Sequence, residues 1–311
     1  MMPVCLGLDT SNYTTSVAVF DGKQGENCGR LLTVPEGALG LRQSEALFQH
    51  VKRLPELFSV LRREGMLEHI AAVGASTRPR AVEGSYMPCF LPGETVGRCV
   101  ADALGVPFFA CAHQEGHVAA AAWSAGCADL LDRPHWAWHL SGGTTELLYV
   151  GPDGHGIKAE RVGGTSDISA GQLIDRTGKL LGLDFPAGRA LDTLTEGEEV
   201  GKFYRVKLNG LTFSLSGVEN QVKAMAEQGL RPQHIACYVL DTVAHAVQAA
   251  TRAAGEMKPG LPVLCSGGVA SSRRLRQWMD DALFAVPEYS TDNAMGVAIL
   301  TWRMLQGEGR T

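Results

Sequence analysis

The 311-residue sequence lacks the features that would assign it to several specialised classes of protein. It has no excess of basic residues, because 28 Lys and Arg stand against 33 Asp and Glu. The resulting net charge of −5 leaves no electrostatic footprint for non-specific nucleic-acid binding. It has no run of about 20 apolar residues, so we expect no transmembrane helix. The opening residues Met1-Met2-Pro3-Val4 carry no basic segment of a signal peptide, and we expect a cytoplasmic protein with no membrane association.

Cysteine pairs and low-complexity tracts are also missing. The eight cysteines include no CxxC motif and lie mostly in apolar contexts, which is typical of buried, reduced thiols. The remaining composition, 45% hydrophobic and 20% charged with 37 glycines, is that of a globular protein. The length allows two ordinary domains or one large domain.

The most distinctive stretch contains two histidines four residues apart, His113 and His117, followed by an alanine-rich segment that favours a helix. Residues i and i+4 share one helix face, so both imidazoles can reach one metal ion. Asp292 is our candidate for a third ligand. The alternative is a chance pair of helical histidines. A metalloprotease is disfavoured, because Glu115 is the third residue of the pentapeptide 113–117, whereas in His-Glu-x-x-His the glutamate is the second.

Two segments share the layout strand, polar turn, strand. The first is residues 4–20, with the turn Asp9-Thr10-Ser11, and the second is residues 136–150, with the turn Ser141-Gly142-Gly143-Thr144. Backbone NH groups and hydroxyls in such turns can face phosphate groups. The repetition predicts a duplicated architecture with a ligand between the halves, and a pair of ordinary glycine turns is the alternative.

Hydrophobic periodicity predicts the other elements. We expect further strands at 31–34, 70–76, 106–110 and 262–265. We expect helices at 41–63, with Pro55 kinking or splitting it, and at 93–103, 168–181, 190–195, 218–228, 235–255, 271–283 and 294–305.

Six motifs in this order resemble the Gcp/TsaD family, the tRNA threonylcarbamoyladenosine synthase subunit formerly described as a glycoprotease (peptidase M22). The resemblance covers nearly the whole chain. The motifs are His113-Gln114-Glu115-Gly116-His117, Ser141-Gly142-Gly143, the segment from Asp175 to Pro186, Phe213-Ser214-Leu215-Ser216-Gly217, Gly267-Gly268-Val269 and Thr291-Asp292-Asn293.

The resemblance implies an α/β protein with the actin-like ATPase (ASKHA) fold, in which two duplicated lobes surround a nucleotide cleft. We expect an N-terminal lobe of residues 1–109, completed by the C-terminal helix 292–311, and a second lobe of residues 110–291.

The resemblance also implies the site residues, although none is assigned a catalytic role. His113, His117 and Asp292 match the family's metal ligands, and iron or zinc suits two imidazoles and a carboxylate. Asp175 matches an acceptor for ribose hydroxyls. The segments that would hold an adenine nucleotide or threonylcarbamoyl-adenylate contain His139, Leu140, Ser141, Gly142, Gly143, Asp175, Gly188, Gly267, Gly268 and Ser272.

The activity implied is transfer of a threonylcarbamoyl group from its adenylate to an adenosine beside the tRNA anticodon. The implied partners are tRNA and protein subunits of the tRNA threonylcarbamoylation system. Differences from the family gather at the site and indicate a divergent paralogue. Asn12-Tyr13-Thr14 stands in place of Cys-Asp-Glu, Thr144 in place of histidine, Ser272 in place of asparagine, and residues 78–84 in place of a Gly-Pro-Gly loop.

These differences leave two alternatives open. One is a nucleotide- and metal-binding paralogue without turnover that acts as a scaffold or regulator. The other is a small-molecule kinase of the same fold with Asp9 or Asp175 as the base, because a shared fold does not fix the function.

Overall fold

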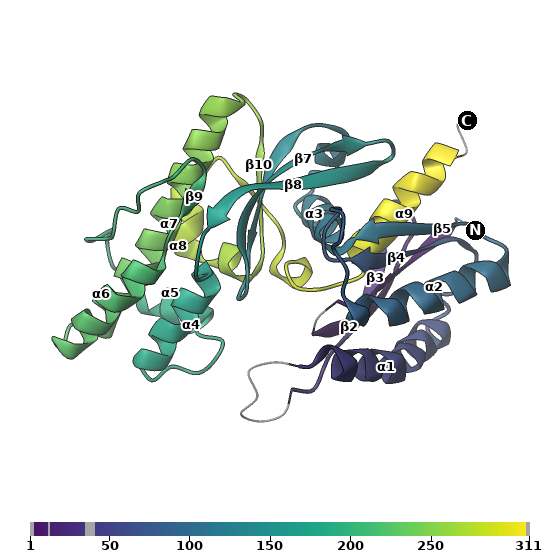
Figure 1. Ribbon diagram of the computed structural model, residues 1–311, viewed down its shortest axis with the longest axis horizontal. Coiled ribbons are helices and arrows are strands. Elements are labelled where there is room, and N and C mark those ends of the chain that lie inside the picture. The colour runs from purple at the N-terminus through teal and green to yellow at the C-terminus, as the bar shows by residue number, and fades with distance from the viewer. Residues whose placement is uncertain (1–2, 12, 35–40, 309–311) are drawn as a thin grey trace. The chain divides into compact units, whose positions relative to one another are not determined.

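The computed structural model describes residues 3–11, 13–34 and 41–308, and the chain divides into two compact units (Figure 1). Unit 1 contains residues 1–133, 151–159 and 292–311, and unit 2 contains residues 134–150 and 160–291. The boundary expected from the sequence lay at residue 109. Residues 110–133 belong to unit 1 because the helix that they contain packs against the C-terminal helix.

The sheet of unit 1 has five strands in the order β3-β2-β1-β4-β5. The first three are antiparallel neighbours, and β4 and β5 are added in parallel to β1. The strands are β1 Val4–Asp9, β2 Thr14–Phe20, β3 Gly25–Leu31, β4 Ile70–Arg78 and β5 Phe108–Ala112.

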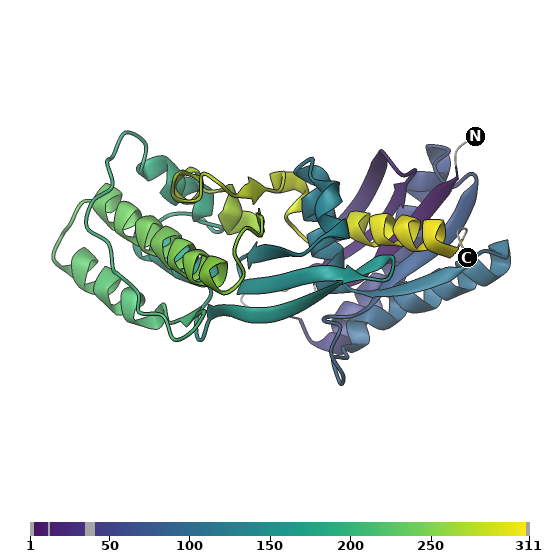
Figure 2. The ribbon, with the colours of Figure 1, turned by 90° about the horizontal axis from the view of Figure 1, so that it is seen from above.

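Helices cover both faces of this sheet (Figures 1 and 2). Because side chains alternate along a strand, Leu6 and Leu8 enter the core formed with α1 and α2, while Gly7 faces α9. A Cβ at Gly7 would lie 2.5 Å from the backbone nitrogen of Ala298, so α9 packs directly on the sheet. The helices are α1 Gln43–Arg63, α2 Leu91–Leu104, α3 His113–Ser124 and α9 Met295–Glu308.

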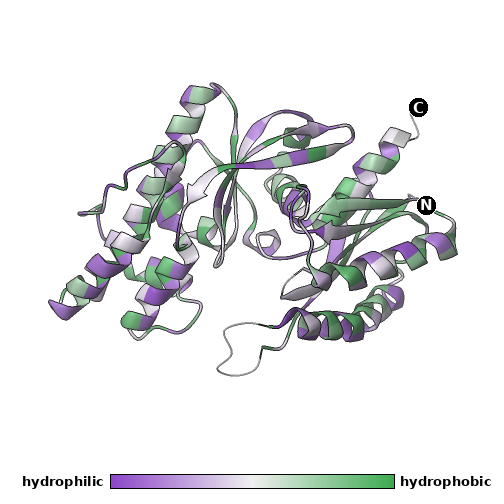
Figure 3. Cartoon of the chain, in the orientation of Figure 1, coloured by the Kyte–Doolittle hydropathy of each residue, from purple (hydrophilic) through white to green (hydrophobic). Residues whose placement is uncertain are grey.

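The sheet of unit 2 has six strands in the order β11-β10-β6-β7-β8-β9. Its long central helix α7 packs in one core with Trp138 and other buried residues of the strands. Hydrophobic and hydrophilic residues alternate along the helices, as expected where one helix face is buried (Figure 3). The strands are β6 His135–Leu140, β7 Thr145–Asp153, β8 Gly156–Thr165, β9 Thr212–Phe213, β10 Val263–Ser266 and β11 Leu283–Phe284. The helices are α4 Ala170–Leu180, α5 Gly188–Leu194, α6 Ser216–Glu227, α7 Pro232–Met257 and α8 Arg273–Trp278. Short 3-10 helices occur at Pro88–Phe90, Ala128–Asp132, Gly268–Ser271 and Pro287–Tyr289.

The two sheets repeat one strand plan, as the two hairpins of the sequence predict. Strands β8-β7-β6-β10-β11 follow the same order as β3-β2-β1-β4-β5, and in both sheets the parallel strands adjoin the first strand of the hairpin. The duplicated α/β architecture is therefore present in the strand order itself.

Several elements differ from the sequence-based expectations, and three of them concern segments that the hydrophobic pattern did cover. The third strand is Gly25–Leu31 and not residues 31–34, because an edge strand needs only one paired side and no apolar pattern. Helix α1 is not split at Pro55 but continues through it. The helix expected at 271–283 ends at Trp278, and a short strand follows it. Within the described ranges, no helix has both the length and the apolar character needed to cross a bilayer.

Candidate functional site

Three side chains of unit 1 converge on one point at the N-terminal end of α3. The Nε2 atoms of His113 and His117 lie 3.0 Å apart. The Oδ1 atom of Asp292 lies 3.1 Å from Nε2 of His117 and 3.5 Å from Nε2 of His113. We call His113, His117 and Asp292 the triad.

The triad fits a divalent metal ion. Ligand bonds of about 2.0–2.2 Å place neighbouring ligand atoms about 3.0–3.5 Å apart around one ion. The three distances within the triad fall in this range. Two imidazole nitrogens and a carboxylate oxygen are a donor set that iron and zinc accept. The arrangement therefore agrees with the metal ligands expected from the sequence.

A close helix crossing brings the triad together. A Cβ built on Gly296 of α9 would lie 1.7 Å from the carbonyl oxygen of Gly116 of α3, so the two backbones touch there. The triad histidines lie on either side of Gly116 in the sequence, and Asp292 lies four residues before Gly296, in the segment that leads into α9. Asn27 fixes the start of α9 through a 3.0 Å hydrogen bond from the backbone NH of Ala294 to its Oδ1. Residues distant in the sequence thus meet at one crossing point.

Asp9 orients the ring of His113. It is 1% exposed, and its Oδ2 lies 2.7 Å from Nδ1 of His113. Its other oxygen accepts hydrogen bonds of 2.8 Å from the Ser76 hydroxyl and the Ser11 backbone NH. A carboxylate at Nδ1 fixes the ring and leaves Nε2 for a metal. The sequence did not indicate this contact: it offered Asp9 as part of a polar turn after a buried strand and as a candidate kinase base, and not as a partner of His113.

The charges of His113, Asp9 and Asp292 change one another's pKa values. Burial disfavours the charged form of His113, but the carboxylates of Asp9 and Asp292 outweigh it and raise the pKa of His113 to about 10. Burial also disfavours the charged carboxylate of Asp292, yet its hydrogen bonds to the two histidines hold its pKa well below the usual range. The site therefore keeps both carboxylates negative, which favours a cation.

Unit 2 contains a cavity of about 700 Å³ between α4, α5 and the segment after β10, which we call the unit 2 cavity. Its lining includes five residues expected from the sequence to hold a nucleotide, Gly142, Asp175, Gly188, Gly268 and Ser272. It also includes charged residues that the sequence did not single out, Asp192, Glu196 and Arg273.

The turn after β6 is fixed at this cavity by the start of α4. The hydroxyl of Ser169, the N-cap of α4, donates a 2.7 Å hydrogen bond to the carbonyl of Gly142. A Cβ at Gly171 would lie 2.5 Å from the carbonyl oxygen of Ser141, so the helix packs directly on the turn. The turn at Ser141-Gly142-Gly143 and the start of α4 therefore pack together and form one side of the cavity.

Five other residues expected to hold a nucleotide are not among the residues that line the cavity: His139, Leu140, Ser141, Gly143 and Gly267. Leu140 is fully buried, and Gly267, at φ 94°, brings the backbone so close that a Cβ would lie 2.2 Å from the Leu140 carbonyl oxygen. Ser141 accepts a 3.1 Å hydrogen bond from the Thr144 backbone NH. His139 pairs with Ser266 across the sheet.

Two polar residues of the lining already have partners. Asp175 accepts a 2.9 Å hydrogen bond from the Ala187 backbone NH, and the Ser272 hydroxyl donates a 2.7 Å hydrogen bond to Asp192. Asp192 also accepts from Nε of Arg273 at 2.9 Å. Burial would raise the pKa of Asp192, but these hydrogen bonds outweigh it and lower the pKa. Asp192 and Arg273 carry no spacing signal by which the sequence could have identified them.

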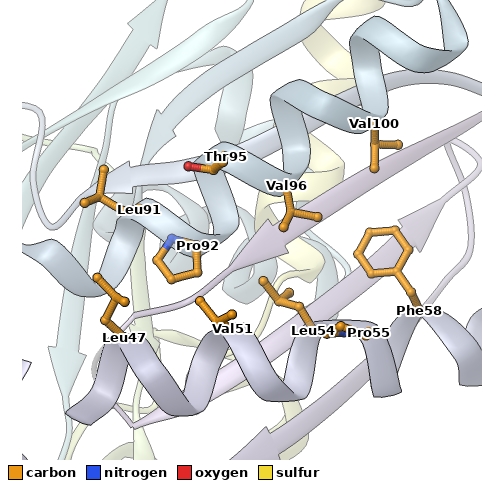
Figure 4. A pocket seen from close by; sticks show the side chains of 10 residues that line it. All are labelled: Leu47, Val51, Leu54, Pro55, Phe58, Leu91, Pro92, Thr95, Val96 and Val100. Atoms are coloured by element: carbon orange, nitrogen blue, oxygen red, sulfur yellow. The ribbon is translucent and has the colours of Figure 1, made fainter. Parts of the chain in front are cut away.

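A second cavity, of about 610 Å³, lies between α1 and α2, and we call it the α1–α2 groove (Figure 4). It lies on the face of the unit 1 sheet opposite α9. Aliphatic, proline and phenylalanine side chains line it, together with Thr95: Leu47, Val51, Leu54, Pro55, Phe58, Leu91, Pro92, Val96 and Val100. The described residues that line it include no titratable side chain, so we assign no chemistry to it.

Comparison with known proteins places these features in a family. The family model of TsaD, described as tRNA N6-adenosine threonylcarbamoyltransferase, matches residues 40–299. Curated proteins of that description from two strains of Thermus thermophilus are 32% identical to this chain, over 97% of its length and 93% and 92% of theirs.

Solved structures support the fold. Component A of (R)-2-hydroxyglutaryl-CoA dehydratase from Acidaminococcus fermentans matches 98% of this chain and 99% of its own, with a TM-score of 0.57 and 14% identity. A ROK hexokinase from Thermus thermophilus matches 97% of this chain and 99% of its own, with a TM-score of 0.52 and 13% identity. Full-length HypF matches 98% of this chain and 55% of its own, with a TM-score of 0.60 and 14% identity. These likenesses concern the fold alone, and they confirm the actin-like ATPase fold.

Proposed function

Because the chain belongs to the TsaD family, the tRNA N6-adenosine threonylcarbamoyltransferases, we propose that it transfers a threonylcarbamoyl group from its adenylate to an adenosine beside a tRNA anticodon. The observation that carries this proposal is the triad, whose three ligand atoms lie within 4.8 Å of one another. The proposal places the protein in the cytoplasm with tRNA.

In this proposal His113, His117 and Asp292 hold a divalent iron or zinc ion. When bound, such an ion would polarise the acyl carbonyl and orient the donor. Asp9 keeps the His113 ring in one orientation by accepting at Nδ1. The close packing of α3 on α9 keeps Asp292 beside the histidines, so that the ligand set is organised before the ion arrives.

The unit 2 cavity would hold the adenylate. Gly142 and Gly268 lack side chains, and a Cβ at either would meet no atom within 4 Å, which lets the backbone approach phosphate oxygens. The carboxylate of Asp175 would accept from ribose hydroxyls, and the guanidinium of Arg189, exposed on the lining, would attract the phosphate. Because AMP is the leaving group, holding it in place supports both binding and departure.

A protein partner of the threonylcarbamoylation system would dock on the α1–α2 groove. Phe48 and Val51 of α1 are 56% and 53% exposed beside it, and Leu91 of α2 is 40% exposed. Large exposed apolar side chains around an apolar groove are typical of an interaction surface.

The test is a transfer assay with product identification. Purified protein is given threonylcarbamoyl-adenylate, unmodified tRNA and partner proteins, and the tRNA is digested and its nucleosides are analysed by mass spectrometry. We expect threonylcarbamoyl-adenosine with the native chain and none with His117→Ala, although the variant still binds adenine nucleotide in calorimetry.

Other outcomes would favour the alternatives. Nucleotide binding without any product, in the presence of all partners, would indicate the paralogue without turnover, which Thr144 and Tyr13 favour because they stand where the family has histidine and acidic groups. ATP consumption that depends on a sugar or small acid would indicate a kinase.

A further inference from the structure

The loop between β4 and the Pro88–Phe90 helix, residues 79–87, is fixed beside the triad at both ends. The carbonyl of Pro79 accepts a 3.0 Å hydrogen bond from the backbone NH of Gln114, which follows His113. Just after the loop, the ring of Phe90 lies 6.0 Å from the ring of His113, measured between centroids. The 79–87 loop therefore borders the proposed metal site.

The 79–87 loop contains an exposed tyrosine and an exposed arginine. Tyr86 is 60% exposed and Val82 is 58% exposed. Arg80 is also exposed, and Glu83 is the acidic residue of the loop. The loop has internal structure, because the Ser85 hydroxyl accepts a 3.1 Å hydrogen bond from the backbone NH of Arg80. These side chains are thus displayed on a folded segment.

We propose that the 79–87 loop binds the RNA acceptor, with Arg80 against a backbone phosphate and Tyr86 stacked on an unpaired base. This inference rests on the proposed function, in which an adenosine must approach a donor beside His113. A guanidinium suits phosphate geometry, and an exposed aromatic ring provides a stacking surface for a base in a single-stranded loop. The chain is acidic overall, so attraction of RNA depends on such local cations.

RNA explains the loop better than a protein partner does. A protein interface favours a central, continuous apolar surface, and unit 1 already has one in the α1–α2 groove. The 79–87 loop instead alternates charged, small and aromatic residues in the order Pro-Arg-Ala-Val-Glu-Gly-Ser-Tyr-Met.

Limited proteolysis tests the contact without any need for activity. Trypsin can cleave the loop after Arg80, whereas the bond after Arg78 resists cleavage because proline follows. We expect saturating unmodified tRNA to slow cleavage after Arg80 several-fold and to leave cleavage after Lys202, in an exposed segment of unit 2, unchanged. Equal rates at Arg80 with and without tRNA would overturn the proposal.

Binding of labelled tRNA to loop variants, measured against salt concentration, separates the two contacts. Arg80→Gln should lower the slope of log affinity against log salt by about one, because one fewer phosphate is neutralised. Tyr86→Ala should weaken binding by about five-fold or more with little change in slope. The matched control Arg62→Gln, which removes an exposed charge from α1, should change neither quantity.

The outcomes distinguish this inference from the proposed function. Binding is measured without donor or metal, so a chain that binds tRNA through the loop but makes no product contradicts only the proposed function. Product formation with unaltered tRNA affinity in both loop variants contradicts only the inference. Loop variants that weaken association with a partner protein and not with tRNA would also overturn it.

Discussion

Among residues outside the triad, Asp9 has the most direct contact with the proposed metal site, through His113. Replacing it in Asp9→Asn removes the charge that lies 2.7 Å from Nδ1 of His113 and makes its ring a poorer ligand. Loss of such a partner typically weakens metal binding by about 10–100-fold, and we expect a change in that range. Titration of the purified variant with Zn²⁺ or Co²⁺ measures it.

The matched control for this substitution is Asp21→Asn. Asp21 accepts backbone hydrogen bonds in the turn after β2, and its substitution by asparagine removes the same single negative charge. It should leave metal affinity unchanged. Equal affinities for native protein and Asp9→Asn would show that the carboxylate does not support His113.

His50 links folding stability to pH. It is fully buried, its Nδ1 lies 2.8 Å from the Thr15 hydroxyl, and burial lowers its pKa to about 4. In the unfolded chain His50 takes up a proton near pH 6.5, whereas in the folded chain it does so only near pH 4. Stability is therefore lost as pH falls between these values, by about 2.5 kcal/mol at pH 4.5.

Denaturant unfolding at pH 7 and pH 4.5 checks this linkage by comparison with His50→Gln, which cannot titrate. The variant should lose about 2.5 kcal/mol less than the native chain over this interval. The comparison removes contributions from other titrating groups, including the triad. The same loss in both proteins would mean that His50 is protonated in the folded state.

At the residue scale, the sequence could indicate groups that carry a spacing or a motif, but not the groups that support them. The i, i+4 histidines and Asp292 were identified, and they converge. The contact of Asp9 with His113 could not be predicted, because the two residues lie 104 positions apart. The same holds for Asp192, whose role depends on the contact with Ser272, 80 positions away. Such partnerships depend on tertiary contacts that no local pattern records.

At the scale of elements, the crossing of α3 and α9 predicts a sharp difference between two glycines. Gly296→Ala would place a Cβ 1.7 Å from the carbonyl of Gly116, so the helices must separate and move Asp292 from the histidines. We expect at least ten-fold weaker binding of Zn²⁺, and a loss of stability of about 1–3 kcal/mol from overpacking.

The matched control is Gly116→Ala in the partner helix. Its Cβ would meet Val297 at 3.5 Å, an ordinary contact, and alanine favours a helix over glycine by about 1 kcal/mol. We expect native metal affinity and equal or higher stability, measured by titration and thermal unfolding. Unchanged metal binding in both variants would show that the geometry of the triad does not depend on the contact between Gly116 and Gly296.

Elements with strong apolar periodicity were predictable, whereas those set by their neighbours were not. The long helices α1 and α7 and the two hairpins follow their patterns. Strand β3 did not, because its polar sequence is ordered by pairing with β2 alone. Strand β8 has alternating burial only along part of its length and was not predicted. The Gly116 and Gly296 contact has no sequence signature at all.

At the scale of the whole molecule, the repeated hairpins predicted the duplication, and the strand order confirms it. The position of the division was less accessible. Because α3 packs on α9, the chain up to residue 133 belongs to unit 1, and a contact between segments far apart in sequence sets the boundary. Each unit thus has its own sheet, its own core and its own candidate ligand-binding site.

Separate cores predict separate ligand responses, which hydrogen–deuterium exchange can resolve by region. A ligand that binds only the folded state stabilises it by about 2.7 kcal/mol at 100 times its dissociation constant. Zn²⁺ should therefore slow exchange in α3 and α9, and an adenine nucleotide should slow it in α4, α5 and α8. His117→Ala should abolish the first response and keep the second, while Asp175→Ala should do the reverse. If either ligand protected both units to the same extent, and either variant abolished both responses, the prediction of separate ligand responses would be wrong.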